Sequence, residues 1–115
     1  MKDCIFCRIA RGEIPAAVVR RTDDAIAFHD VDPQAPTHVL VIPVRHVPAV
    51  RDARDEESRR LLGALLAFAA DVASGLNLDA GGYRIVTNTG RDAGQSVDHL
   101  HLHVLGGRRM TWPPG

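Results

Sequence analysis

The 115-residue chain lacks the features of several large protein classes. It carries no net charge, because 14 basic residues balance 14 acidic ones, which argues against a sequence-independent grip on long nucleic acid or an anionic membrane. No apolar run approaches the ~18 residues of a membrane span, and the N-terminal segment lacks the long apolar core of a signal peptide. We therefore expect a cytoplasmic protein whose partners include neither a membrane nor long nucleic acid.

Cysteine is scarce, and the two cysteines, Cys4 and Cys7, are too close together to join distant parts of a fold. In a reducing compartment a CxxC pair is typical of half a metal site or of a redox pair. The sequence also has no internal repeats, low-complexity tracts or linkers. Residues 1–115 are therefore predicted to form one domain with a single modest core.

Two helices are predicted from the spacing of apolar residues. Near the N-terminus Ile5, Phe6 and Ile9 have helical spacing and the pattern stops at Gly12, which predicts a short helix. A longer helix begins in the acidic stretch 55–57, where carboxylates complement the helix dipole. Its apolar residues recur every three or four positions, as on a helix with one buried face: Leu61, Leu62, Leu65, Ala69, Val72, Ala73 and Leu76.

The remaining apolar runs predict strands. Two short β-prone runs, AAVVRRTD and AIAFHD, are separated around Thr22–Asp24 like the strands of a hairpin. After a proline-rich loop, residues 38–42 are typical of a buried strand, YRIVTNTG predicts a fourth strand, and the histidine-rich segment predicts a fifth. The expected fold class is α+β: an antiparallel sheet of about five strands with one long helix across a face and one short helix.

Three of the six histidines occupy alternate positions near the C-terminus: His99, His101 and His103. The residues that alternate with them are aliphatic: Leu100, Leu102 and Val104. On a strand the aliphatic residues would face the helix-covered core and the imidazoles the other side, with the outer two histidines ~13 Å apart. Since a metal needs each nitrogen at ~2.1 Å, this spacing disfavours one three-histidine metal site. It favours a row of imidazoles presented along an extended substrate.

The segment HLHLHVL resembles the His-φ-His-φ-His-φ-φ signature of the histidine-triad (HIT) superfamily of nucleotide hydrolases and transferases. The ending LGGRRMTWPPG and the stretch FHDVDPQAPTHVLVIPVRH are similar to the HINT branch in particular. The resemblance runs from about Cys4 to Gly115, nearly the whole chain. It implies a HIT-like form of the α+β fold and chemistry on nucleotides.

The resemblance implies catalytic roles for five residues. His101 would be the nucleophile that attacks the α-phosphorus, giving a nucleotidyl-histidine that water then hydrolyses. His103 would bind a non-bridging phosphate oxygen, and His38 would lie near the leaving group. His99 would lie beside the nucleophile and help orient it, or hold a metal. Ser96 would offer its hydroxyl to a phosphate or to a leaving amine.

A nucleotide pocket is implied as well. The loop GRDAGQSV, in which Gly90 and Gly94 permit close backbone approach, would surround the phosphate. Asp30 would accept hydrogen bonds from the ribose hydroxyls, and apolar side chains would enclose the base, although their spacing alone would assign them to the core. The implied nucleotide-binding set is Phe6, Ile9, Phe28, His29, Asp30, Val31, Leu40, Asn88, Gly94, Gln95, Ser96, Val97, His101, His103 and Trp112.

Relatives with an N-terminal CxxC are similar in binding zinc through two cysteines and two histidines. The resemblance therefore implies a structural zinc site made of Cys4, Cys7, His46 and His99, and no organic cofactor. Such a site would tie the N-terminal helix to the catalytic strand. The alternative is a pair of buried or empty thiols.

Two positions depart from the family pattern. Asp98 stands where relatives more often carry a hydrophobic or aromatic residue, and its carboxylate would either turn toward the histidines or stay solvated. Thr111 stands beside Trp112 where well-known relatives have a histidine. Because the resemblance implies a homodimer in which Trp112 reaches toward the partner's active site, this second change bears on substrate preference.

Three functions are open on this reading. The first is hydrolysis of purine nucleoside phosphoramidates, and of acyl-adenylates, with release of a nucleoside monophosphate. The second is hydrolysis or phosphorolysis of dinucleoside polyphosphates, which the ending GGRRMTWPPG disfavours. The third is a nucleotide-binding regulatory protein with incidental catalysis, which an intact triad accompanied by Ser96 and His38 disfavours.

Overall fold

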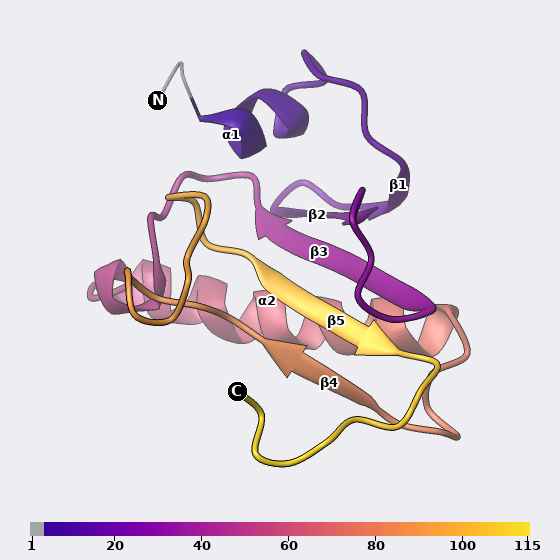
Figure 1. Ribbon diagram of the computed structural model, residues 1–115. Helices are drawn as coiled ribbons and strands as arrows, with labels where there is room; N and C mark the ends of the chain where they lie inside the picture. The colour runs from indigo at the N-terminus through magenta and orange to yellow at the C-terminus, as the bar shows by residue number, and fades with distance from the viewer. Residues whose placement is uncertain (1–3) are drawn as a thin grey trace.

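A computed structural model describes residues 4–115, which form a five-stranded antiparallel sheet with two α-helices and one short 3-10 turn. The chain order is α1 (Ile5–Ala10), β1 (Val18–Arg21), β2 (Ala25–His29), β3 (Thr37–Pro43), η1 (Val50–Asp52), α2 (Glu56–Gly75), β4 (Tyr83–Val86) and β5 (Leu102–Gly106). The strands lie in the order β1-β2-β3-β5-β4, and α2 runs along one face of the sheet (Figure 1). The α+β prediction, with one long and one short helix, is confirmed.

The long helix begins at the acidic stretch that the sequence predicts and ends at Gly75. Asp55 accepts a hydrogen bond from the Ser58 backbone N–H at 3.0 Å and so caps the first turn. Beyond Gly75, Asn77 adopts a left-handed conformation with φ 63°, as a residue that terminates a helix often does. The helix buries one face against the sheet: Leu65, Phe68, Ala69, Val72 and Ala73. Of these, Phe68 was missing from the predicted apolar set. The described part of the chain has no helix both long and apolar enough to cross a membrane.

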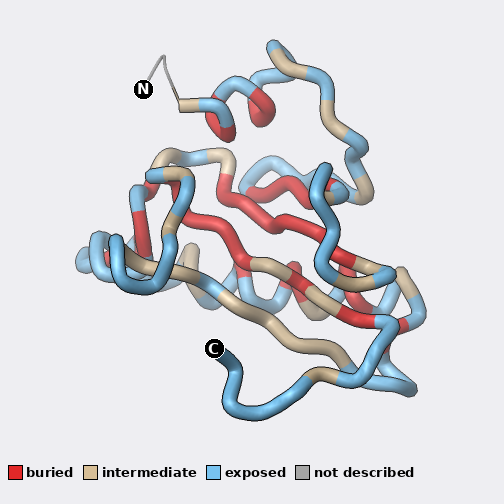
Figure 2. Tube along the Cα trace, in the orientation of Figure 1, coloured by how far each residue is buried: buried red, intermediate tan, exposed pale blue. Residues whose placement is uncertain are grey.

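The sheet is buried on both faces near its centre. On the α2 side the core contains the three aliphatic residues that alternate with the histidines, as predicted: Leu100, Leu102 and Val104. On the opposite side α1 packs against β2 and β3 through a smaller apolar cluster of Phe6, Ile9, Ile26, Phe28, Leu40 and Ile42. Figure 2 shows the resulting buried stripe through β3. Burial on both faces explains why β3 is an almost continuous apolar run.

One strand prediction is wrong. Strand β5 begins at Leu102, so only His103 of the triad lies on it; His101 directly precedes the strand, and His99 lies in a bend. The straight-strand separation of ~13 Å between the outer histidines therefore does not apply here. Side-chain alternation nevertheless persists through the irregular segment, because Leu100 is buried on the α2 side.

The ladder stops before the first two histidines for an identifiable reason. Strand β3 ends at Pro43, which has no N–H to offer a partner strand. The Leu100 N–H instead donates to the Val47 carbonyl at 2.6 Å, and the His101 carbonyl accepts from the Thr87 hydroxyl at 2.9 Å. Loop residues thus hold the segment in place of a strand, which leaves the His99 ring free to turn toward α1.

Candidate functional site

The ring of His101 is only 3% exposed, and its orientation is set by the main chain. Its Nδ1 lies 2.7 Å from the His99 carbonyl oxygen. A carbonyl oxygen can only accept, so Nδ1 carries the proton and Nε2 keeps a lone pair in the neutral ring. Phe6 packs edge-on against the same ring, with 5.1 Å between ring centroids. His101 is therefore held in the tautomer that a nucleophile with a reactive Nε2 requires.

His103 and His38 form a hydrogen-bonded pair between β5 and β3. The Gln34 backbone N–H donates to His38 Nδ1 at 3.0 Å, which places the His38 proton on Nε2. This Nε2–H lies 2.9 Å from His103 Nδ1 and 3.4 Å from the Asp30 carboxylate. Since His103 Nδ1 accepts, its proton is on Nε2. The chain Gln34–His38–His103 thus ends in an N–H donor beside His101, whose ring centroid is 5.1 Å away.

Burial keeps both members of this pair neutral. It lowers the pKa of His103 to about 4, and a positive charge on His101 or His38 would act in the same direction. Burial also lowers the pKa of His38, although Asp30 and Asp32 oppose the shift. The atoms of Asp30, His38 and His103 are close enough to share a metal ion. However, a metal on His38 Nε2 would have to displace the proton that the Gln34 contact places there, so the geometry favours a hydrogen-bond chain.

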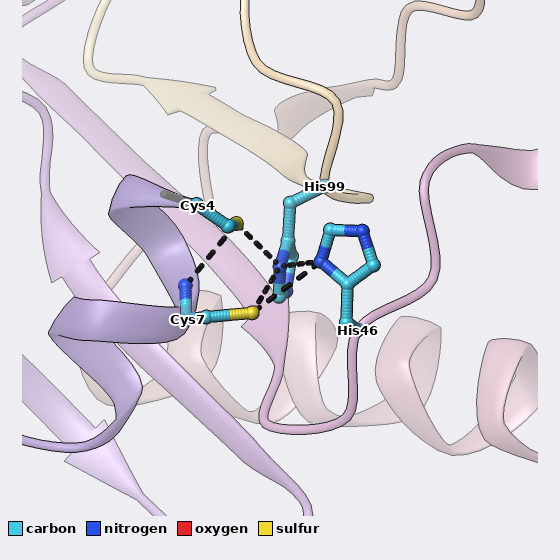
Figure 3. A group of neighbouring side chains, drawn as sticks. All are labelled: Cys4, Cys7, His46 and His99. Atoms are coloured by element: carbon cyan, nitrogen blue, oxygen red, sulfur yellow. Dashed lines mark hydrogen bonds between the residues drawn. The ribbon is translucent and has the colours of Figure 1, made fainter. Parts of the chain in front are cut away.

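The structure brings together the four residues of the predicted metal site (Figure 3). His99 Nδ1 lies 3.3 Å from Cys4 Sγ, 3.5 Å from Cys7 Sγ and 3.1 Å from His46 Nδ1, and Cys7 Sγ lies 3.3 Å from His46 Nδ1. Nitrogen and sulfur ligands at ~2.1 and ~2.3 Å from a tetrahedral zinc lie about 3.4–3.8 Å from one another. The observed separations are close to these edges, so the four residues could bind such an ion.

The protonation states of the residues in this cluster also favour the binding of a cation. His99 donates from Nε2 to the Pro43 carbonyl at 2.9 Å, so its Nδ1 lone pair faces the cluster. Burial lowers the pKa of His99 to about 4, although the Pro43 bond opposes the shift. Burial, together with the neighbouring Cys4, raises the pKa of the Cys7 thiol. A bound cation would reverse this last shift, because metal ligation requires the thiolate.

The glycine-rich loop is fastened internally through Gln95. Its side-chain oxygen accepts from the Gly90 N–H at 2.9 Å, and its amide donates to the Pro48 and Val97 carbonyls at 2.7 and 3.0 Å. The side chain predicted to contact phosphate is thus occupied in shaping the loop. Gly90 and Gly94 both have positive φ, 83° and 81°, as the predicted close turn requires.

The residues of the implied nucleoside pocket divide into two groups. Phe6, Ile9, Phe28 and Leu40 are each 5–8% exposed and pack together, so a base could meet only their outer edges. The polar and loop members differ: His29 is exposed, and Val31 is fully exposed in the single chain. The Asp30 carboxylate is engaged by the Asp32 N–H at 2.8 Å as well as by His38.

Four further residues that the sequence singles out differ in burial and surroundings: Ser96, Asn88, Asp98 and Trp112. Ser96 and Asp98 line a cleft of about 700 Å³ that also borders Cys4 and His46. Asn88 is half-buried. Asp98 is exposed, and its charge opposes the burial that lowers the pKa of His46. Trp112 is 82% exposed; within its own chain its ring lies 6.0 Å from the Arg84 guanidinium.

The spacing of residues in the sequence could not identify several groups that hydrogen-bond to the histidine side chains or to the segment that carries them. The carbonyls of His99, Pro43 and Val47 and the backbone N–H of Gln34 set tautomers or hold the segment. Main-chain groups occur at every position, so no residue type signals them in advance. Thr87 likewise carries no recognisable motif.

Several proteins of known structure that share this fold are HIT or histidine-triad proteins. A HIT family hydrolase from Legionella pneumophila superimposes with a TM-score of 0.94 and 48% identity, over 98% of this chain and 100% of that chain. A histidine triad protein from Clostridium difficile superimposes with a TM-score of 0.92 and 37% identity, over 96% of each chain. An uncharacterized HIT-like protein of Synechocystis is 50% identical over 114 residues, which is 99% of this chain and 98% of that protein.

The HIT domain family matches residues 11–110, and the chain belongs to that family. Its fold is that of its HIT neighbours, and its similarity to HIT family hydrolases supports a hydrolase.

Proposed function

We propose that the chain is a HINT-branch nucleotide hydrolase that cleaves purine nucleoside 5'-phosphoramidates at the α-phosphate, through a covalent nucleotidyl-His101 intermediate. The observation that carries the proposal is the bond from His101 Nδ1–H to the His99 carbonyl, because it leaves Nε2 as the free nucleophile. The HINT assignment and the P–N substrate rest on the ending GGRRMTWPPG and on the resemblance of the whole chain to that branch. Acyl-adenylates, which present the same α-phosphate, are a second substrate class of this enzyme.

The proposed reaction has two steps. In the first, His101 Nε2 forms a bond to phosphorus while the P–N bond breaks, and the departing amine takes a proton from the Ser96 hydroxyl or from the His38 chain. The His103 Nε2–H donates to a non-bridging oxygen as charge gathers there. In the second step water displaces His101 from phosphorus, the proton of the attacking water returns to the group that protonated the amine, and the nucleoside monophosphate leaves. His99 does not touch the phosphate; its carbonyl holds the nucleophile.

The nucleotide is proposed to lie on the sheet face opposite α2. The outer edges of the small apolar cluster around Phe6 and Phe28 support a base-binding role. Asp30 would exchange part of its contact with His38 for the ribose hydroxyls. The loop from Gly94 to Val97, shaped by Gln95, would then meet the phosphate with backbone N–H groups and with Ser96.

A structural zinc ion is proposed at Cys4, Cys7, His46 and His99. The convergence of two thiols and two imidazole lone pairs supports it, and the bound ion would neutralise thiolates that burial otherwise disfavours. The test is metal analysis of protein purified without added zinc. About one zinc per chain is expected, whereas less than about 0.3 per chain would contradict the site.

A homodimer is also proposed. Strand β4 lies at one end of the strand order, so among residues 4–115 one of its edges pairs with no other strand. Leu66 on α2 is 52% exposed and Trp112 is 82% exposed, which leaves large apolar side chains for a partner to cover. The molar mass in solution tests this proposal: twice the chain mass of 12.5 kDa is expected, and a monomer at all concentrations would contradict it.

The proposed activity is tested by comparing wild type with His101→Ala on an adenosine phosphoramidate and on a diadenosine polyphosphate. We expect wild type to prefer the phosphoramidate and the variant to lose at least about 1,000-fold in kcat, as for loss of a covalent nucleophile. Undiminished hydrolysis by the variant would contradict the nucleophile assignment. A preference for the polyphosphate would support the second class of enzyme, and nucleotide binding without hydrolysis of either compound would support a regulatory protein.

A further inference from the structure

His99 joins the metal cluster to the nucleophile within one residue. Its Nδ1 faces Cys4, Cys7 and His46 at 3.1–3.5 Å, and its ring is fully buried. Its main-chain carbonyl accepts the proton of His101 Nδ1 at 2.7 Å. Anything that rotates or displaces the His99 ring therefore acts on the peptide group that fixes the His101 tautomer.

Phe6 provides a second contact between the same two sites. It lies in α1 between the two cysteines, and its ring contacts both imidazoles edge-on, at centroid distances of 5.9 Å to His99 and 5.1 Å to His101. The ring is 7% exposed, so it cannot move without moving its neighbours. The positions of the His99 and His101 rings are therefore linked through their packing against Phe6 as well as through the His99 carbonyl.

The other bonds to His99 do not replace the cluster. Its Nε2 donates to the Pro43 carbonyl, which fixes one ring atom and does not by itself set the tilt of the ring about that contact. Without an ion, His99 Nδ1 and His46 Nδ1 would place two lone pairs 3.1 Å apart, unless one nitrogen is protonated. The metal-free cluster therefore holds His99 Nδ1 by hydrogen bonds alone, which restrain the ring less firmly than a bond to a metal would.

We propose that the Cys4–Cys7–His46–His99 cluster is a positioning device for the nucleophile: metal occupancy holds the His99 peptide in the orientation that keeps His101 Nε2 free. The proposal rests on the function assigned to His101 above. It predicts that metal loss slows turnover more than it weakens nucleotide binding. The reason is that α1 stays docked through its apolar cluster with β2 and β3, which also forms the proposed wall of the base pocket.

The test compares metal-loaded wild type, wild type treated with a chelator, and His46→Ala. His46 is the ligand of choice, because it belongs to neither α1 nor the histidine triad. A cleft of about 700 Å³ borders Cys4 and His46 and gives the chelator access. Three quantities are measured on each protein: kcat on the phosphoramidate, the Kd of AMP, and the ring ¹⁵N shifts of His101, which report its tautomer. Circular dichroism confirms that each protein is folded.

In the metal-free proteins we expect kcat to fall roughly 10- to 100-fold, the range caused by misplacement of a reacting group by about 1 Å. The Kd of AMP should change less than about threefold, and His101 should lose its single Nδ1–H tautomer. The chelator should have no further effect on His46→Ala, which serves as the matched control for chelator effects elsewhere. Phe6→Leu should retain the metal and show a smaller fall in kcat.

Equal kcat and an unchanged His101 tautomer with and without metal would overturn the proposal. So would a larger change in AMP affinity than in kcat, because that result would assign the cluster to pocket formation alone. Failure of the proposed function gives a different pattern: metal-loaded wild type would be inactive on the phosphoramidate. The ¹⁵N comparison would still decide whether the cluster orients His101.

Discussion

The neutral state of His103 predicts a loss of stability in mild acid. Its pKa is held at about 4 in the folded chain, against the ordinary value of 6.5 expected after unfolding. Between these values the unfolded chain binds more protons than the folded chain. The free energy of unfolding therefore falls as the pH falls through this window, and the stabilisation is present above about pH 6.5.

The magnitude follows from the two pKa values. From pH 7 to pH 5 the linkage relation gives an upper value of about 2 kcal/mol for His103. The side chain is only half-buried, so solvent screening reduces this to about 1 kcal/mol. The perturbation that isolates it is His103→Gln, because the glutamine oxygen can still accept from His38 Nε2–H. The variant should lose about 1 kcal/mol less than wild type over the same pH interval.

The assay is denaturant unfolding at pH 7 and pH 5, followed by helical circular dichroism. The difference between the two proteins cancels the contributions of the other titrating groups. His29→Gln, which removes an exposed histidine, is the control and should show the wild-type pH dependence. Equal losses in wild type and His103→Gln would refute the conclusion that burial keeps His103 neutral.

Three further predictions concern packing, the turn after β5 and the glycine-rich loop. Leu65→Ala should lower the free energy of unfolding by about 2–4 kcal/mol, whereas Arg59→Ala, at an exposed position of the same helix, should change it by less than about 0.5 kcal/mol; equal effects would contradict the assigned helix face. Gly107→Ala should cost about 1–3 kcal/mol in thermal denaturation, because Gly107 has φ +90° and a Cβ there would lie 2.9 Å from Pro36. Gln95→Ala should lower kcat roughly tenfold through the loosened loop, and an unchanged rate would show that its three hydrogen bonds do not shape the site.

Much of the fold could be predicted because the local sequence patterns agree with the helices and strands that the chain forms. The acidic start of α2 and its apolar period marked that helix, and the alternation of aliphatic residues with histidines identified the side facing the core. Phe68 was overlooked, although it falls on the same face of the helix. The sheet order and the burial of β3 between two apolar layers emerge only when all the strands are paired.

The sequence indicated which residues form the site, but it did not indicate which atoms contact one another. The grouping of Cys4 and Cys7 with His46 and His99 was expected from the family resemblance and is present in the structure. The bend at His99 was not expected, because the end of β3 at Pro43 depends on tertiary pairing. The bend has two chemical consequences. It turns the His99 ring toward α1, and it leaves the His99 carbonyl in hydrogen-bond contact with the His101 ring.

The engagement of Asp30 by His38 was also absent from the sequence reasoning. Asp30 directly follows β2 and His38 lies eight positions later on β3, and nothing in their spacing indicates a 3.4 Å contact. The contact gives Asp30 two partners, a histidine in the free protein and, by our proposal, a ribose in the complex. Residue identity alone suggested only the second.

The central claim is that His101 Nε2 is the atom that attacks phosphorus. The most direct test is to quench wild-type protein with acid-free denaturant early in a single turnover of an adenosine phosphoramidate, and to map the modified peptide by mass spectrometry. One adenylyl group is expected, on His101 alone, and it should form and decay at rates compatible with kcat. An adduct on His99 or His103, or turnover with no adduct under conditions that preserve phosphohistidine bonds, would contradict it.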